Sequence, residues 1–471
     1  MPDPIARHAA GRPEAPALTG AGDVWSYAAL DAAVARTQAR LEARGIGPGD
    51  RVALHRAPSA ALVQLFWALW RAGAVAVPLS TREPPSTVAA QAEQAGADLL
   101  VTETLGGNEA AAEGAAVCAP GALVGPDGPT VRPTPRPPTR PATVLYTSGS
   151  TGPPKAALHT WANHLYSAKG ANANLPLRAG DRWLLSLPLY HVGGVAILVR
   201  CALAGAAVAL PPPGAPPAEA LPATRATHVS MVATQLRRLL HATDGAPPPR
   251  LRAVLLGGGP IPDALLRAGT DRGWPLLTSY GCTEMASQVT TTAPGAVLGT
   301  LRTAGRRLPH RRLRIRDGRI LVGGPPLFTG YLTDDGLVDP RDEDGWYATG
   351  DLGRIDAQGR LHVEGRVDHM FVSGGENVVP EEIEAALERE PVVVRAVVVP
   401  VPDPEYGRRP VAFVQARDAW TEAGLRAALE ETLPGFKIPD AFHSLPEEAG
   451  TGRLKIDRTA LARRARALRN H

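Results

Sequence analysis

A segment rich in glycine and hydroxyl groups, Thr147-Ser-Gly-Ser-Thr-Gly-Pro-Pro-Lys155, is the first candidate for chemistry. Glycines let a ligand approach the backbone, amides and hydroxyls donate to phosphate oxygens, and a lysine neutralises their charge. The segment is not a Walker loop, because its lysine does not directly follow the second glycine. By itself such a turn is more often structural than phosphate-binding. The residues expected at phosphate are Thr147, Ser148, Gly149, Ser150, Thr151, Gly152 and Lys155.

Three later segments add groups that suit a nucleotide. Gly257-Gly-Gly259 offers bare backbone after a strand, although a simple turn is the alternative. Ser279-Tyr-Gly-Cys-Thr-Glu284 combines an aromatic face, a hydroxyl and a carboxylate, which suit a stacked base, a phosphate and a magnesium ion. Asp351, at the end of Gly345-Trp-Tyr-Ala-Thr-Gly-Asp351, could accept hydrogen bonds from a ribose or could simply cap a turn. A charged pair, Arg366 and Asp368, and a glycine loop beginning at Ser373 follow.

Alternating helix and strand patterns must position these segments. Apolar residues at helical spacing predict a helix over Tyr27 to Gly45 and another over 60–73, with strands at 51–54 and 74–79. This alternation predicts an α/β architecture with largely parallel sheets. Prolines crowd the stretch 120–141, which is therefore expected to be a loop, and the strand at 143–146 enters the glycine-rich turn.

A second change of pattern comes near Gly365. A predicted helix over 378–388, strands over 392–401 and 411–415 and a helix over 421–432 make a small mixed domain. We therefore expect an N-terminal domain of αβ subdomains over 1–365 and a small, mobile α+β domain over 366–471.

Composition narrows the class of protein. The 471 residues carry 50 Lys and Arg against 46 Asp and Glu, so the net charge of +4 does not indicate nucleic-acid binding. The basic stretches at 302–319 and 453–469 are expected to be solvated faces. Three separated cysteines suggest neither a disulfide framework nor a CxxC metal site. No segment resembles a signal peptide or a membrane span, and we expect a soluble cytoplasmic protein.

In this order and spacing, the five segments resemble the adenylate-forming superfamily of acyl-CoA synthetases, peptide-synthetase adenylation domains and luciferases, over nearly the whole chain. The resemblance implies ATP, Mg²⁺ and coenzyme A (CoA) as the cofactor and co-substrates. It also implies roles by position. The 147–155 loop would hold the triphosphate, Thr283 would contact the α-phosphate, and Glu284 would bind magnesium. The adenine base would be lined by Gly257, Gly258 and Gly259 and would lie against Tyr280 and Gly281. Asp351 and Arg366 would hold the ribose.

The resemblance also implies how a second step follows adenylation. Asp368 matches the hinge about which the small domain rotates, although His369 replaces an acidic residue common in the family. Ser373, Gly374 and Gly375 match the loop that borders the pantetheine tunnel for CoA. Lys455 matches the adenylation lysine, although Arg453 and Leu454 separate it from the preceding glycine. A surface lysine is the alternative.

Several segments are similar to one branch of this superfamily, the o-succinylbenzoate–CoA ligases of menaquinone synthesis. These include 155–160, 183–192, 227–235 and 373–377. His191 would border the acyl pocket, with a packed core histidine as the alternative, and Ser287 and Gln288 could hydrogen-bond a second carboxylate or a ketone. The expected partners are a small carboxylic acid, ATP and CoA, without nucleic acid or membrane. Another aryl- or fatty-acid ligase, a carrier-loading adenylation enzyme and a degenerate nucleotide-binding scaffold remain alternatives.

Overall fold

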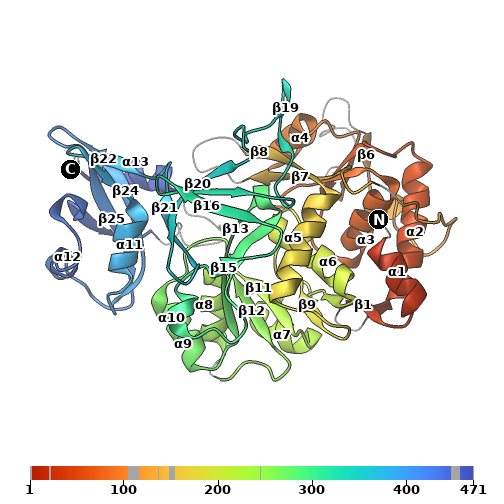
Figure 1. The fold of residues 1–471 in the computed structure, drawn as a ribbon, viewed down its shortest axis with the longest axis horizontal. Coiled ribbons are helices and arrows are strands. Elements are labelled where there is room, and N and C mark those ends of the chain that lie inside the picture. Colours follow the sequence, from red (N-terminus) through yellow and green to blue (C-terminus); the bar gives the residue numbers. More distant parts are fainter. Residues whose placement is uncertain are drawn as a thin grey trace.

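The chain forms a large N-terminal domain and a small C-terminal domain that lie at opposite ends of the long axis (Figure 1). The structure is a computed structural model, and it describes residues 3–20, 23–103, 116–135, 137–147, 154–243, 245–446 and 457–469. The expected division into a large domain with αβ subdomains and a small α+β domain is confirmed.

The first sheet of the N-terminal domain has nine strands, and its middle strands run parallel. Strands such as β11 and β12 are buried at every position, as expected for parallel strands covered by helices on both faces. Antiparallel strands complete both edges. The order is β15 (Arg306–Arg307), β14 (Ser287–Thr291), β13 (Leu276–Cys282), β12 (Ala253–Leu256), β11 (His228–Met231), β9 (Arg182–Leu184), β10 (Ala207–Ala209), β1 (Pro16–Thr19) and β2 (Val24–Ser26).

The second sheet has eight strands and continues from a parallel half into an antiparallel half. The antiparallel half begins at β8, directly after the predicted phosphate loop, and ends in a projecting hairpin of β18 and β19. The order is β19 (Gly336–Val338), β18 (Gly330–Thr333), β8 (Lys155–Thr160), β7 (Pro141–Thr147), β4 (Val75–Pro78), β3 (Arg51–His55), β5 (Leu99–Thr102) and β6 (Ala116–Cys118).

Helices cover these sheets, and α2, α3, α5 and α6 contribute to one large apolar core. Ser59 caps the start of α3, and Gly73 ends it at a φ of 87°, a conformation that glycine adopts without strain. The helices are α1 (Pro4–Gly11), α2 (Tyr27–Glu42), α3 (Ala60–Ala72), α4 (Pro85–Gln94), α5 (Trp161–Asn174), α6 (Val192–Ala204), α7 (Pro217–Thr224), α8 (Ala233–Ala242), α9 (Asp263–Asp271) and α10 (Leu298–Leu301), with short 3₁₀ turns η1 (Pro120–Ala122) and η2 (Thr283–Met285).

A third sheet of four antiparallel strands joins the N-terminal domain to the C-terminal domain. Its strands are β16 (Arg312–Arg316), β17 (Arg319–Gly323), β20 (Tyr347–Ile355) and β21 (Leu361–Arg366). The expectation of largely parallel sheets does not extend to this part of the chain. The basic stretch 302–319 is also not solvated throughout, since Arg311 is only 1% exposed. Four carbonyl oxygens and the Ser167 hydroxyl accept its hydrogen bonds and so replace the water that it has lost.

The C-terminal domain has its own apolar core, formed by helices and a three-stranded sheet of order β24-β25-β26. Its elements are β22 (Phe371–Ser373), β23 (Glu376–Val378), α11 (Pro380–Leu387), β24 (Val393–Asp403), β25 (Gly407–Ala416), α12 (Glu422–Glu430), η3 (Gly435–Lys437), β26 (Ala441–Ser444) and α13 (Arg458–Arg469).

The expected local elements are largely confirmed. The helices predicted near residues 27, 60, 378 and 421 are α2, α3, α11 and α12, and after η1 the described part of 120–141 is irregular up to the start of β7. Within the described ranges, none of the helices combines the length and the apolar character needed to cross a lipid bilayer.

Candidate active site

The motif Ser279–Glu284 lies where β13 leaves the first sheet and turns into η2. Gly281 is required here, because a Cβ atom would lie 2.1 Å from the carbonyl oxygen of Ser287 on the paired strand β14. The carbonyl of Thr283 accepts a hydrogen bond from Nε2 of His159, at 2.7 Å. Burial lowers the pKa of His159 to about 4, so its ring is neutral at physiological pH. The backbone of the motif is therefore fixed by a neutral core histidine.

The carboxylate of Glu284 is held by two phenols. The Tyr331 hydroxyl donates to Oε1 at 2.5 Å, the Tyr347 hydroxyl lies 3.3 Å from the same oxygen, and the two hydroxyls are 2.9 Å apart. Nζ of Lys155, at the start of β8, lies 5.3 Å from the centre of the Tyr331 ring. Two predicted triphosphate and metal residues, Lys155 and Glu284, thus contact the same tyrosine.

A second carboxylate, Asp351 on β20, contacts β13 through Tyr280. The Tyr280 hydroxyl donates to Oδ2 of Asp351 at 2.5 Å, and Nη1 of Arg366 donates to Oδ1 at 3.1 Å. Arg366 also makes two hydrogen bonds to the Asp368 carboxylate, at 2.8 and 3.0 Å. Burial raises the pKa of Asp351 above the ordinary aspartate value, against the hydrogen bonds from Tyr280 and Arg366. The predicted ribose residues are therefore linked directly to the predicted hinge residue.

The donor set fits magnesium bound together with a nucleotide. Mg²⁺ is commonly held by one or two carboxylates plus substrate phosphates and water rather than by an all-protein cage. No cluster of three or more potential metal ligands occurs among the described side chains. Glu284 supplies a carboxylate beside Lys155, at the end of the predicted phosphate loop.

The glycine segments are placed with their backbone accessible, but part of the predicted site is not described. A Cβ on Gly257 would lie 2.8 Å from Oγ of Ser279, Gly258 has a φ of 81°, and Gly259 has open space beside it. The amide of Lys155 donates to Oγ1 of Thr147 across the base of the phosphate loop, at 3.3 Å. Ser148, Gly149, Ser150, Thr151, Gly152 and Lys455 lie outside the described residues.

The predicted acyl-pocket residues border helix α6. His191 precedes the first residue of α6, and its ring lies 4.7 Å from that of Tyr190 in an edge-to-face arrangement. Ser287 has a φ of 114° at the turn from η2 into β14. Gln288 is 7% exposed, and its amide is engaged: Oε1 accepts from Arg200 at 3.1 Å and Nε2 donates to Thr291 at 2.5 Å.

A buried arginine on α6, Arg200, contacts the predicted acyl-pocket residue Gln288 and was not predicted from the sequence. Its side chain is buried, with the guanidinium carbon 4.1 Å from the centre of the Trp183 ring and Nε donating to Asn172 at 2.9 Å. Within the described part of the chain it forms no ion pair, and its Nη2 has no hydrogen-bond partner. Burial lowers its pKa to about 9. The available signal was its position on the apolar helix that directly follows His191.

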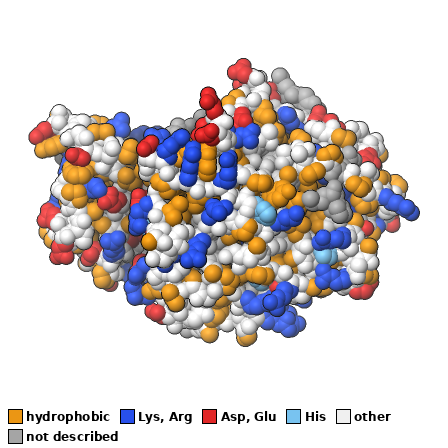
Figure 2. Space-filling view, viewed as in Figure 1, with side chains coloured by type: hydrophobic (Ala, Val, Ile, Leu, Met, Phe, Trp, Pro, Cys, Tyr) orange, Lys and Arg blue, Asp and Glu red, His pale blue; other side chains and the backbone are white. Residues whose placement is uncertain are grey.

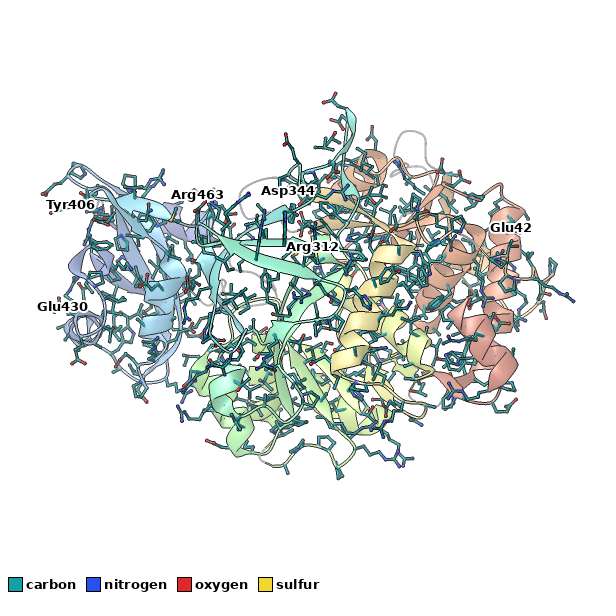
Figure 3. All side chains as sticks on the ribbon, in the orientation of Figure 1. Glu42, Arg312, Asp344, Tyr406, Glu430 and Arg463 are labelled. Carbon is teal, nitrogen blue, oxygen red and sulfur yellow. The ribbon has the colours of Figure 1, made fainter. Side chains whose placement is uncertain are left out.

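The predicted CoA loop is the hairpin between β22 and β23. Gly374 and Gly375 have φ values of 59° and 89°, so both central positions need the left-handed conformation of a tight hairpin turn. Ser373 is fully buried, and its hydroxyl is 3.4 Å from Nη1 of Arg409 inside the C-terminal domain. The Tyr406 ring lies against Gly374, at the outer end of this domain (Figure 3). The loop therefore offers backbone rather than the Ser373 side chain to a ligand.

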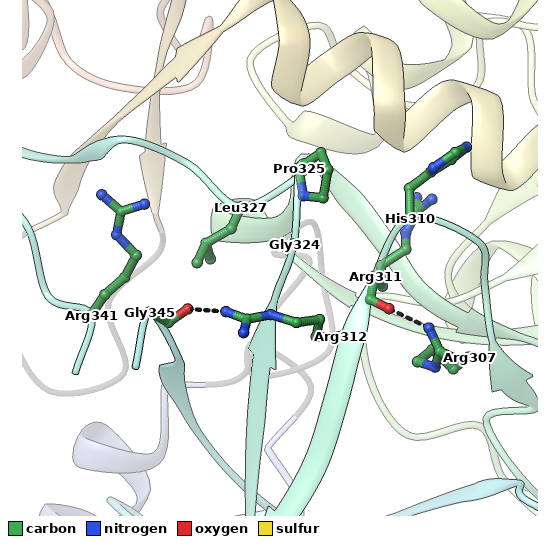
Figure 4. A pocket seen from close by; sticks show the side chains of 9 residues that line it. All are labelled: Arg307, His310, Arg311, Arg312, Gly324, Pro325, Leu327, Arg341 and Gly345. Carbon is green, nitrogen blue, oxygen red and sulfur yellow. Dashed lines mark hydrogen bonds between the residues drawn. The ribbon is translucent and has the colours of Figure 1, made fainter. Parts of the chain in front are cut away.

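A cavity of about 600 Å³ lies on the face where many Lys and Arg side chains gather (Figure 2), and Nε of Arg311 in its lining donates to the carbonyl of Gln288 at 2.8 Å. Arg307, Arg312 and Arg341 line it together with His310, and Arg312 donates to the carbonyl of Gly345 at 2.7 Å (Figure 4). None of the residues predicted for the site lines this cavity.

Comparison with known proteins agrees with the geometry. The AMP-binding enzyme family model matches residues 5–332, and the AMP-binding enzyme C-terminal domain model matches 382–453. A 2-succinylbenzoate–CoA ligase of Salmonella typhimurium is 36% identical over 452 residues, which cover 96% of this chain and 95% of that protein.

Two solved structures of the o-succinylbenzoate coenzyme A synthetase of Bacillus subtilis are similar over most of the chain. The complex with the acyl-adenylate intermediate has a TM-score of 0.89 at 30% identity and covers 98% of both chains. The complex with ATP and magnesium has a TM-score of 0.85 at 30% identity and covers 94% of this chain and 96% of that one. The present chain belongs to the AMP-binding enzyme family.

Proposed function

We propose that this chain is an ATP-dependent, AMP-forming ligase that activates 2-succinylbenzoate as an acyl-adenylate and transfers the acyl group to CoA. One observation carries the adenylation step: the short stretch from Tyr280 to Glu284 joins the metal carboxylate Glu284 to the ribose carboxylate Asp351. The full-length similarity to ligases of this acid supports the substrate.

In the first step, an oxygen of the substrate carboxylate attacks the α-phosphorus of ATP, and pyrophosphate leaves. Lys155, Thr283 and the 147–152 loop would hold the phosphates, while Asp351 and Arg366 hold the ribose. Magnesium, when bound at Glu284, neutralises charge on the triphosphate. Lys455 would stabilise the negative charge between the carboxylate and the phosphate as that bond forms. No nucleophile of the protein is needed.

In the second step, the CoA thiolate attacks the acyl carbon and AMP leaves. We place the domain boundary between Gly365 and Arg366, and we assign Asp368 as the hinge that brings the Ser373–Gly375 loop to the acyl site. The Arg366 guanidinium, which contacts both Asp351 and Asp368, supports this assignment. The three cysteines are free thiols, which favours a reducing compartment, and we place the enzyme in the cytoplasm.

We assign Arg200 to the carboxylate of 2-succinylbenzoate that is not activated. A buried guanidinium without an ion pair carries a large desolvation cost, which an anionic ligand would offset. Guanidinium groups also match the planar, two-oxygen geometry of a carboxylate. The Gln288 amide fixes the guanidinium from the side of β14. Gln288 is thus assigned an indirect role rather than the direct contact expected from the sequence.

Pyrophosphate release with a panel of acids tests this function. 2-Succinylbenzoate, benzoate, hexanoate and a set of amino acids are compared with and without CoA, and acyl-CoA is identified by mass. We expect 2-succinylbenzoate to be the fastest acid and its CoA thioester to accumulate only with CoA. Equal rates with benzoate or hexanoate would refute the assigned acid, and absence of release with every acid would favour a degenerate nucleotide-binding protein.

A further inference from the structure

The two phenols at Glu284 are fixed in place by a third aromatic ring. Phe328 is 1% exposed and meets the Tyr331 and Tyr347 rings edge-on, with centroid distances of 4.8 and 5.5 Å. Its backbone amide also donates to the carbonyl of Glu284, at 2.8 Å. Phe328 therefore fixes both the backbone of Glu284 and the rings that reach its carboxylate.

Both hydroxyls act on a single carboxylate oxygen. Tyr331 and Tyr347 lie 2.5 and 3.3 Å from Oε1 of Glu284, and the contact between the two hydroxyls forms a closed triangle. A phenol has an ordinary pKa of about 10, so both hydroxyls carry a proton at neutral pH. The Tyr331 hydroxyl donates to Oε1, and the single Tyr347 proton is shared between Oε1 and the Tyr331 oxygen. Together the two hydroxyls hold Oε1 in place, and the position of Oε1 determines where Oε2 points.

Tyr331 has a second contact on the face of its ring. Nζ of Lys155 lies 5.3 Å from the ring centre, within the range of a cation–π interaction. Tyr331 lies on β18, which pairs with β8, the strand that begins at Lys155. One side chain therefore contacts both a cation of the phosphate loop and the metal carboxylate.

We propose that Tyr331 and Tyr347 are positioning residues for the magnesium–triphosphate, with their hydroxyls orienting Glu284 toward the metal and the Tyr331 ring orienting Lys155 toward phosphate. This inference rests on the proposed binding of magnesium by Glu284. Hydrogen-bond partners of metal ligands typically contribute about 10- to 100-fold to metal affinity. A tyrosine pair that served only packing would stabilise the fold but would leave the coupling between magnesium binding and ATP binding unchanged.

The test is the ratio of ATP affinity with magnesium to ATP affinity without it, measured by isothermal titration calorimetry in the absence of acid. This ratio reports the coupling between metal and nucleotide, and general damage to the site affects both affinities together. We expect the double variant Tyr331→Phe/Tyr347→Phe to lower the ratio at least about 10-fold. Tyr166→Phe removes a hydroxyl from a ring that packs edge-on against His310 and that is not one of the two phenols at Glu284, so it should leave the ratio unchanged.

Three single variants separate the parts of the inference. Tyr331→Leu removes the ring as well as the hydroxyl, so its ATP affinity without magnesium should fall a few-fold below that of Tyr331→Phe, as expected for a lost cation–π contact. Glu284→Gln should abolish the magnesium effect. An unchanged ratio in the double phenylalanine variant would overturn the positioning role. If Glu284→Gln also kept the wild-type ratio, the proposed metal site itself would be wrong.

Discussion

Replacing Arg200 with methionine separates a substrate-binding role from a structural one. Methionine is flexible and uncharged, and its shorter side chain can fill part of the space beside Trp183. The expected result is a large loss of activity toward 2-succinylbenzoate without a loss of stability. Most substitutions of buried core residues instead lower the stability of the fold, and activity is lost only as a consequence.

The structure gives the size of both effects. A hydrogen bond between charged groups contributes about 1.5–3 kcal/mol, so losing one arm of a guanidinium–carboxylate pair lowers kcat/KM by about 10- to 160-fold, and losing both arms lowers it further. In the folded protein, burial lowers the pKa of Arg200 from 12.5 to about 9, which corresponds to about 5 kcal/mol against the charged form. The lost contacts to Gln288, Asn172 and Trp183 offset much of this relief. The melting temperature should therefore stay constant or rise.

The assay compares the dicarboxylic acid with its two monocarboxylic analogues, each lacking one carboxyl group. Wild-type enzyme should prefer the dicarboxylic acid strongly over the analogue that keeps only the activated carboxyl. Arg200→Met should remove this preference and leave the rate with that analogue unchanged. Equal losses of rate with the dicarboxylic acid and with the analogue that keeps only the activated carboxyl would show that Arg200 has a structural role. A melting temperature that falls together with activity would show the same, and either result would refute the assigned role in substrate binding.

Three other changes have defined outcomes. His159 is neutral in the fold, because its pKa is about 4 against an ordinary value of 6.5. Its contribution to folding stability should therefore be fully present above about pH 6.5 and fall by about 3 kcal/mol as the pH drops toward 4. His159→Gln should flatten this slope in chemical denaturation, and an unchanged slope would contradict the prediction. Gly281→Ala places a Cβ 2.1 Å from a carbonyl oxygen and should lower the melting temperature sharply. Gly259→Ala is the control, because Gly259 has open space beside it, and it should not lower the melting temperature. Similar melting temperatures for the two variants would argue against the β13–β14 geometry. Lys455→Ala should abolish adenylation but still convert added acyl-adenylate and CoA into thioester, and loss of both activities would assign the adenylation role to another residue.

The local elements could be predicted because helical and strand periodicity are properties of neighbouring residues. The periodicity of 27–45 and 60–73 corresponds to α2 and α3, and the prolines of 120–141 exclude regular structure for a local reason. The antiparallel sheet β16-β17-β20-β21 was not predicted. Its strands alternate less clearly, since β16 has no fully buried position and β20 has only two. Two of its pairings are hairpins of consecutive strands, but the β17–β20 pairing that joins these hairpins depends on contacts between separated segments, which a local pattern does not contain.

Two buried arginines show why the site was only partly predictable. Arg311 and Arg200 are 1% and 2% exposed, and burial lowers the pKa of each to about 9. Carbonyl oxygens from several segments satisfy Arg311, so its charge supports the fold and needs no ligand. Arg200 contacts an amide, an asparagine and an aromatic ring, and it keeps a buried Nη2 without a partner. In the sequence both are arginines in basic or apolar surroundings. Only the count of acceptors around each guanidinium, a tertiary property, separates the structural arginine from the one suited to bind an anion.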